Sequence, residues 1–378
     1  MERIYRKTTS GSEVALSDAP RQANRDQPGE WDSALAALVS PAPLLQSWGW
    51  GEVYRSLGWR PERVQLPGGG RALVLLRGTW PLRWGYAPRG PVPATLETAI
   101  ELADWARSER LAMLRIEPEG PVELREQLRE AGFRPGRSIE PRHSAIVRLQ
   151  DPEAMLASFR RTTRYNIRLA ERQGVTVEEV TSTEELYRQI QATASRHRVE
   201  MDGPDYHRAL VECMPDHHLY VARHEGVALA ANLVVRHDRR SYYLLAGSNG
   251  LRRELKPNYA LLWRALVDAY AAGCVDNDLY GMPPPDDPTH PWHGLSEFKN
   301  GFSGSPVEYT GTWEIALSPT ASWVLKAGQR TNRRAERLAL RLRLAISRPG
   351  QSPERAGTSP PVATAEPMAS EPEHDLNS

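Results

Sequence analysis

The chain has 378 residues, which is too long for one ordinary core and predicts two globular units. Charged residues make up 25% of it and hydrophobic residues 40%, as is usual for a globular protein. The formal net charge is only +1, which excludes an overall field that would recruit nucleic acid or anionic membrane; any such attraction must come from local patches. Its two cysteines, Cys213 and Cys274, form neither a disulfide framework nor a metal-ligand pattern.

The first 35 residues are expected to be a disordered leader, because charges mix with Gly, Ser and Pro without periodicity. They lack the apolar segment of a signal peptide, and no stretch approaches the roughly 20 apolar residues that span a bilayer. The sequence therefore predicts a cytoplasmic protein. Peripheral contact with the inner face of the plasma membrane stays open.

From residue 36 to residue 150 the pattern predicts a first α/β domain. The turn at 67–70, Pro-Gly-Gly-Gly, joins two strands into a hairpin, and Gly132 is placed to end a helix. The expected helices span 44–57, 93–110 and 123–131, and the expected strands span 63–66, 72–76, 112–117 and 145–149.

Residues 151–318 predict a second domain of similar design. Its helices are expected at 152–173, 183–198 and 258–272, and its strands at 219–222, 227–236, 241–246 and 275–280. A basic helix follows at 319–347, and a Pro- and Ser-rich tail at 348–378 is expected to be disordered. Two interpretations of the basic helix stay open: a helix packed on the body by its Leu face, or a contact with tRNA or lipid head groups.

No common catalytic signature is present, and no metal site is predicted. Only four of the 48 basic residues are lysines, so each lysine raises the question of a position that needs a compact ammonium. Lys299 lies between Phe298 and Phe302 with glycines nearby, where packing would position it and partly desolvate it. Such an ammonium can stabilise negative charge that develops during acyl transfer.

Several segments, taken in their order and spacing, resemble the Fem family of peptidoglycan aminoacyltransferases. The resemblance runs from about Leu44 to Thr312. The matching stretches are 45–48 with 50–51, 86–91, 141–143, 163–168, 257–263, then Asp278, Gly281 and 298–302.

This resemblance implies two tandem acetyltransferase-like domains with substrate in the cleft between them, and a final helix that returns to the first domain. The chain is similar to the compact members, which lack a coiled-coil arm. The implied reaction moves an amino acid from aminoacyl-tRNA to the peptide stem of a peptidoglycan precursor, either lipid II or UDP-MurNAc-pentapeptide. The ester is already activated, so neither ATP nor acetyl-CoA is implied as a cofactor.

The resemblance also implies roles for individual residues. Lys299 would be catalytic, stabilising the oxyanion or the terminal phosphates of the tRNA, and Phe298 would position that end. Many relatives grip the precursor's phosphates with a lysine where this chain has Tyr54, so Arg55 is the candidate substitute. The other expected substrate-binding residues are Trp48, Arg164, Arg196, Tyr206, Asn258 and Tyr259.

Two other functions remain open from the sequence. One is an acetyl-CoA-dependent acyltransferase of a small molecule or protein, although the nearest candidate for a pyrophosphate loop, 247–250, is poor. The other is a non-catalytic RNA-binding module that uses the basic helices. A pure RNA binder would not need the pair Phe298 and Lys299.

Overall fold

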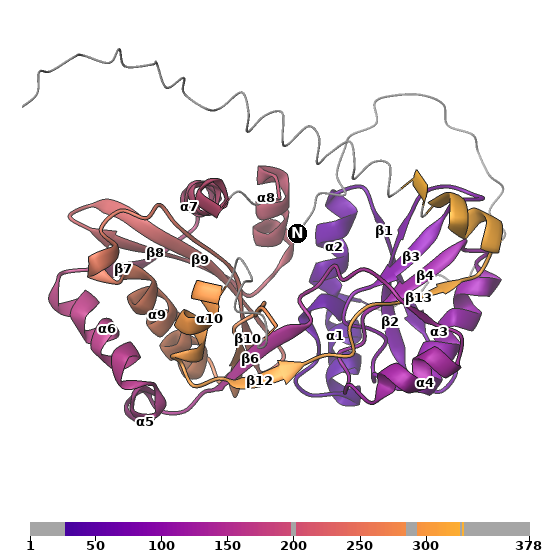
Figure 1. Cartoon of the computed structure of the whole chain (residues 1–378), viewed down its shortest axis with the longest axis horizontal. Helices are drawn as coiled ribbons and strands as arrows, with labels where there is room; N and C mark the ends of the chain where they lie inside the picture. The colour runs from indigo at the N-terminus through magenta and orange to yellow at the C-terminus, as the bar shows by residue number, and fades with distance from the viewer. Residues whose placement is uncertain (1–26, 198–201, 285–292, 326, 329–378) are drawn as a thin grey trace, which may run out of the picture. The chain divides into compact units, whose positions relative to one another are not determined.

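The computed structural model describes residues 27–197, 202–284, 293–325 and 327–328 (Figure 1). Their strands form two mixed sheets, one of six strands and one of seven. We call the part built on the first sheet the first lobe and the part built on the second sheet the second lobe. Within the described residues, no helix combines the length and the apolar character that a membrane span requires.

The first sheet has the strand order β1-β2-β3-β4-β13-β5. The hairpin predicted at 67–70 joins β1 and β2, and β3 runs parallel to β4 because α3 crosses between them. Its strands are β1 (Arg60–Gln65), β2 (Arg71–Arg77), β3 (Trp84–Ala87), β4 (Met113–Ile116), β5 (Arg134–Pro135) and β13 (Trp313–Ala316). Its helices are α1 (Pro28–Leu38), α2 (Trp48–Ser56), α3 (Leu96–Ser108) and α4 (Leu124–Glu130), with a 3₁₀ turn, η1 (Leu44–Gln46).

The second sheet has the order β12-β6-β11-β10-β9-β8-β7. Its strands are β6 (His143–Arg148), β7 (Thr176–Val180), β8 (His217–His224), β9 (Val227–His237), β10 (Arg240–Ser248), β11 (Asp276–Asp278) and β12 (Ser305–Glu308). Its helices are α5 (Pro152–Ser158), α6 (Arg161–Arg172), α7 (Thr183–His197), α8 (Pro204–Cys213), α9 (Pro257–Ala271) and α10 (His293–Asn300), with a 3₁₀ turn, η2 (Arg253–Leu255). One core lies between this sheet and α6 and α9.

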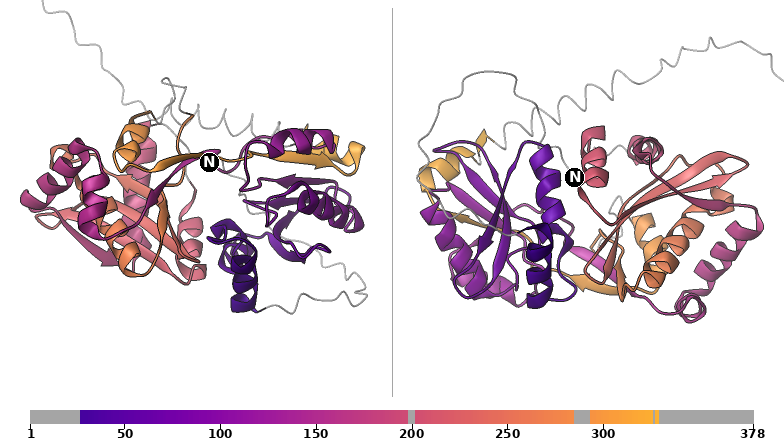
Figure 2. Two further views of the ribbon diagram at one scale, coloured as in Figure 1. Left: turned by 90° about the horizontal axis from the view of Figure 1, so that it is seen from below. Right: turned by 180° about the vertical axis from the view of Figure 1, so that it is seen from behind.

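Strand pairing differs from the boundary expected at residue 150. Strand β6 was assigned to the first domain, yet it pairs with β11 and β12 in the second sheet. Strand β13 lies within the range assigned to the second domain, yet it pairs with β4 and β5 in the first sheet. The chain therefore passes from each lobe to the other, as the course from β12 to β13 shows in Figures 1 and 2. Side-chain burial explains the exchange, because Val147 packs in the second core and Trp313 in the first.

Two expected segments need correction. The leader was expected to be disordered through residue 35, but α1 begins at Pro28 and buries Trp31 and Leu35 completely. The helix expected over 152–173 is two helices, because Phe159 is extended and buried, and the Arg160 N–H donates to the carbonyl of Gly301. Residues 1–26 of the leader, most of the basic helix expected at 319–347, and the tail lie outside the described residues.

One hydrophobic cluster contains residues of both lobes. Trp50 and Tyr54 of α2 belong to it together with Tyr206 and Leu210 of α8. The approach is close: a Cβ added at Gly49 would lie 2.7 Å from the carbonyl oxygen of Cys213. Glycine at this position therefore lets the two helices meet, and the lobes share an apolar core.

Candidate active site

A cluster of aromatic rings fixes the last turn of α10. The ring of Phe298 meets Tyr259 of α9 edge-on, with centroids 4.9 Å apart, and meets Phe302 at 5.3 Å. Phe302 is fully buried and contacts the ring of Phe159 at 5.1 Å. Such tilted aromatic pairs favour one mutual orientation, so the residue that follows Phe298 is held in one position.

That residue is Lys299, whose side chain is only 3% exposed. Its Nζ donates to the carbonyl oxygens of Tyr280 at 2.6 Å and Gly281 at 2.8 Å. Burial lowers the pKa of the ammonium to about 7, and the charge of Asp278 offsets part of that effect. An ammonium has three N–H donors, and the described residues supply no third acceptor.

The two accepting carbonyls belong to consecutive residues in the left-handed region. Tyr280 has φ +43° and Gly281 has φ +77°, and a side-chain oxygen of Asp278 accepts the Tyr280 N–H at 2.8 Å. A left-handed tyrosine is uncommon, so the surrounding contacts must maintain it. Asp278 therefore both shapes the turn and places a negative charge near Lys299.

Buried glutamate side chains lie next to this turn. The hydroxyl of Tyr280 donates to Glu140, whose pKa burial raises to about 7, with a further contribution from Glu117. Glu117 in turn accepts hydrogen bonds from Tyr86 and Thr312. Since these residues come from both lobes, a continuous chain of polar contacts links Lys299 to the first sheet.

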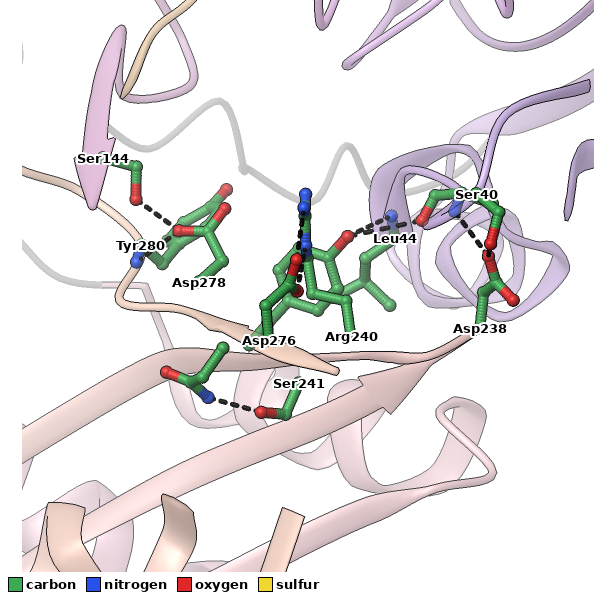
Figure 3. A network of polar contacts seen from close by, with 12 residues as sticks. Ser40, Leu44, Ser144, Asp238, Arg240, Ser241, Asp276, Asp278 and Tyr280 are labelled. Carbon is green, nitrogen blue, oxygen red and sulfur yellow. Dashed lines mark hydrogen bonds and ion pairs between the residues drawn. The ribbon is translucent and has the colours of Figure 1, made fainter. Parts of the chain in front are cut away.

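Figure 3 shows further polar contacts along the same strands. The guanidinium of Arg240 forms two hydrogen bonds with Asp276, at 2.6 and 2.9 Å. It also lies 3.3 Å from Glu119, whose pKa burial raises to about 7 despite the nearby arginines. Asp238, at the turn before β10, accepts from the hydroxyl of Ser40 and the N–H of Ala42 in the first lobe. These bonds tie the lobes together by charge as well as by apolar packing.

The residues expected to hold the precursor have unequal exposure. Tyr54 and Tyr206 are 8% and 6% exposed and belong to the shared apolar core. Trp48 is half-buried, and the guanidinium of Arg63 lies 3.4 Å from its ring centroid. Arg55 is exposed and pairs with Glu52 at 3.0 Å. Of these four expected residues, Arg55 alone has a charged side chain, and that side chain is exposed.

Three further expected residues lie on other elements of the second lobe. Arg164 of α6 donates to the carbonyl oxygens of Ala157 and Phe159. Arg196 of α7 donates to the carbonyl oxygen of Ser248 at 2.6 Å. Asn258 is half-buried in the first turn of α9, directly before Tyr259.

The structure thus brings together Phe298, Lys299 and Tyr259, which sequence reasoning had placed in one site. It adds a set that sequence reasoning missed: Tyr280, Glu140, Glu119, Glu117 and Arg89. The sequence offers one signal for this set: the three acids Glu117, Glu119 and Glu140 lie within a few residues after strands β4 and β5. Their shared burial could not be read from the sequence, because residues of both lobes create it.

Comparison with known proteins identifies the family. The model of the FemAB family matches residues 131–223 and 218–329, slightly more than half of the chain. The chain is 24% identical over 317 residues to a UDP-N-acetylmuramoylpentapeptide-lysine N(6)-alanyltransferase of Weissella viridescens, covering 73% of this chain and 90% of that enzyme.

The fold is similar to the crystal structure of FemX, with a TM-score of 0.70 at 19% identity over 80% of this chain and 98% of that one. The expected α/β architecture is confirmed: the chain forms two sheets and shares the fold of FemX. The chain therefore belongs to the FemAB family and is an aminoacyltransferase of peptidoglycan synthesis.

Proposed function

We propose that this chain transfers an amino acid from aminoacyl-tRNA to an amino group on the peptide stem of a peptidoglycan precursor. The UDP-linked pentapeptide is the first acceptor to test, because it appears in the name of the Weissella enzyme, and this chain covers 90% of that enzyme. The observation that carries the proposal is the buried ammonium of Lys299, which donates to two carbonyls and has no third acceptor among the described residues.

The reaction balances without a further reactant. The neutral amine of the stem attacks the ester carbonyl of the aminoacyl-tRNA and forms a C–N bond. The tetrahedral intermediate carries an oxyanion, and its collapse breaks the C–O bond to the ribose. The amine loses a proton and the ribose hydroxyl gains one, so the products are an amide and free tRNA. The ester is activated enough to drive this step.

Lys299 would stabilise the negative charge of this step through its third N–H. A hydrogen-bond donor directed at a developing oxyanion stabilises it more in a site without water than in bulk water, because no solvent has to reorganise. The terminal phosphates of the tRNA are the other anion that this ammonium could meet. In either role Phe298 and Tyr259 would position the lysine, and Asn258 would line the same site.

For the precursor we propose contacts with Arg55, Trp48 and Arg196. Arg55 offers an exposed guanidinium for the pyrophosphate, as a replacement for the lysine of many relatives. Tyr54 and Tyr206 are left out of this set because the rings of both belong to the shared apolar core. The cleft between the lobes remains a prediction, as does the location of the enzyme in the cytoplasm, where charged tRNA is available.

The test is transfer in vitro. The purified full-length chain is incubated with UDP-MurNAc-pentapeptide and with tRNA charged separately with Gly, Ala, Ser and other amino acids. Mass spectrometry should show the acceptor gaining the mass of one residue with at least one charged tRNA. Acetylation of the acceptor from acetyl-CoA, with no gain from any charged tRNA, would contradict the proposal.

A further inference from the structure

Helix α6 carries a row of arginines on the face that it does not use for packing. Its buried residues, Thr163, Ile167 and Ala170, face the core of the second lobe. The arginines follow at intervals of three and four residues, so they share one side of the helix over a length of about 16 Å. An open hollow of about 320 Å³ lies along them, lined by Arg161, Arg164, Tyr165, Arg168 and Arg172.

The acidic partners of these arginines can be compared with those of other exposed arginines on helices. Within the described parts of the chain, no carboxylate forms an ion pair with any of the four. Exposed arginines on other helices differ: Arg107, Arg129 and Arg188 each pair with an acid three or four residues away. Two acids lie beside the row: Glu171, on the helix itself, and Glu153, which lines an adjoining hollow with Arg164 and Arg168. The row is thus a local concentration of positive charge without ion pairs to the described residues, in a chain of net charge +1.

The chemistry of the row suits phosphate groups. A guanidinium binds phosphate with two parallel N–H donors, which is why arginine predominates where phosphates are recognised. Tyr165 stands among the arginines with 56% of its surface exposed, although large aromatic rings are usually buried. Exposed aromatic rings beside a basic groove are typical of single-stranded nucleic acid sites, where bases stack on them.

The same features disfavour a membrane. An amphipathic helix that binds lipid inserts an apolar face into the head-group region. The apolar face of α6 is already buried in the protein core, and Tyr165 is the one large apolar side chain on its exposed side. The row can therefore bind phosphates from outside but cannot insert.

The first turn of α6 lies beside Gly301, two residues after Lys299. The N–H of Arg160 donates to the carbonyl oxygen of Gly301 at 3.0 Å, and a Cβ at Gly301 would collide with Thr163. The first turn of α6 therefore packs directly on the segment that follows α10. A polynucleotide whose end reaches Lys299 could continue along α6.

We propose that the arginine face of α6 binds the sugar-phosphate backbone of the donor tRNA near its acceptor end, with Tyr165 stacking on an unpaired base. This inference rests on the proposed function for the identity of the RNA. The phosphate contacts are made by Arg161, Arg168 and Arg172. Arg164 also stabilises the junction of α5 and α6 by donating to two backbone carbonyls.

The experiment replaces Arg161, Arg168 and Arg172 together by glutamine in the full-length chain. The matched control replaces Arg107, Arg129 and Arg188, which are also exposed but are paired with acids. Binding of uncharged tRNA is measured by fluorescence anisotropy at several salt concentrations. The α6 variant should bind roughly a hundredfold more weakly at low salt, and the slope of log affinity against log salt should fall by about 1 for each phosphate that an arginine no longer neutralises. The control variant should bind like the wild type.

Melting temperatures check folding, and because all six side chains are exposed, both variants should melt like the wild type. Unchanged tRNA affinity and salt slope in a folded α6 variant would overturn the proposal. So would a result in which that variant keeps its tRNA affinity but loses binding to vesicles containing phosphatidylglycerol, since the row would then bind lipid.

Failure here can be separated from failure of the proposed function. Transfer with an unchanged KM for charged tRNA in the α6 variant would refute the role of α6 while leaving the transferase intact. Loss of salt-dependent tRNA binding in the α6 variant, in a protein that transfers nothing from any charged tRNA, would support the RNA surface and count against the reaction. If both proposals hold, KM for charged tRNA rises while KM for the precursor stays the same.

Discussion

Replacement of Lys299 by methionine tests the proposed chemistry most directly. Methionine keeps the unbranched stem and its packing but removes the ammonium. The carbonyls of Tyr280 and Gly281 lose their common donor, and the substrate loses the third N–H. If Lys299 stabilises the charge that develops in the transition state, turnover must fall even though the fold survives.

The structure sets the expected size of the effect. Burial lowers the pKa of Lys299 from 10.5 to about 7, which corresponds to a destabilisation of the charged form by about 5 kcal/mol relative to water. An approaching anion restores the charged form and interacts with it in a water-poor site. The loss of one such donor typically costs a factor of about 10² to 10³ in kcat, and we expect that range here.

The pH dependence gives a sharper criterion than the rate alone. Below pH 7 the free enzyme holds Lys299 as the ammonium; above pH 7 it is increasingly neutral, so the advantage of lysine over methionine must decrease. The ratio of wild-type to Lys299→Met kcat/KM should therefore be constant below about pH 7 and should decrease up to tenfold per pH unit above it. Titration of the acceptor amine cancels in this ratio, because both enzymes use the same substrate.

The assay follows amide formation on the precursor with charged tRNA between pH 6 and pH 9. The companion variant is Lys299→Arg, which should be as inactive as Lys299→Met. The space between the two carbonyl oxygens fits a compact ammonium but not a planar guanidinium. A folded Lys299→Met enzyme with normal turnover would refute the assigned role. A ratio that does not vary with pH would show that the titrating ammonium is not the acting group.

Three other outcomes are expected. Glu140→Gln should change the pH dependence of stability: a folded-state pKa raised from 4.5 to about 7 makes the wild type lose stability as pH rises between those values, by up to about 3 kcal/mol, and urea unfolding at pH 5 and pH 8 should show that loss reduced in the variant. Gly301→Ala should lower the melting temperature through the collision with Thr163, and adding Thr163→Ala should recover most of the loss; no recovery would mean that the contact of α6 with α10 is not the cause. Trp31→Ala should destabilise the protein by about 3 to 5 kcal/mol in chemical unfolding, because the indole is fully buried and donates to the carbonyl of Gln46, whereas a disordered leader would give no change.

Local chemistry explains which elements could be predicted from the sequence. The hairpin of β1 and β2 follows from the Pro-Gly-Gly-Gly turn, and helix α9 from a periodic apolar face bounded by Pro257 and Gly273. Lys299 could be predicted as a site residue because lysine is rare in this chain and because Phe298 precedes it. In each case the signal lies within a few residues of the structure that it predicts.

The missed features depend on contacts between distant segments. Only Trp31 and Leu35 of helix α1 are buried, so its amphipathic pattern is weak until the shared core is formed. Strands β6 and β13 read as ordinary strands, and nothing local states which sheet each joins. The raised pKa values of Glu119 and Glu140 arise from burial, which local sequence does not reveal. A single sequence holds no record of such pairings.

The rarity of lysine in this chain has a physical explanation at position 299. An arginine keeps its charge under all ordinary conditions, so a buried arginine gains most from a carboxylate partner, as Arg115 has in Glu314. A lysine between two neutral carbonyls can release its proton instead, and a pKa of about 7 limits the cost of burial in the empty site. When an anionic substrate arrives, the same group takes a proton and supplies the charge. A site that must be stable without substrate and cationic with it therefore favours lysine, even in a chain that uses arginine almost everywhere else.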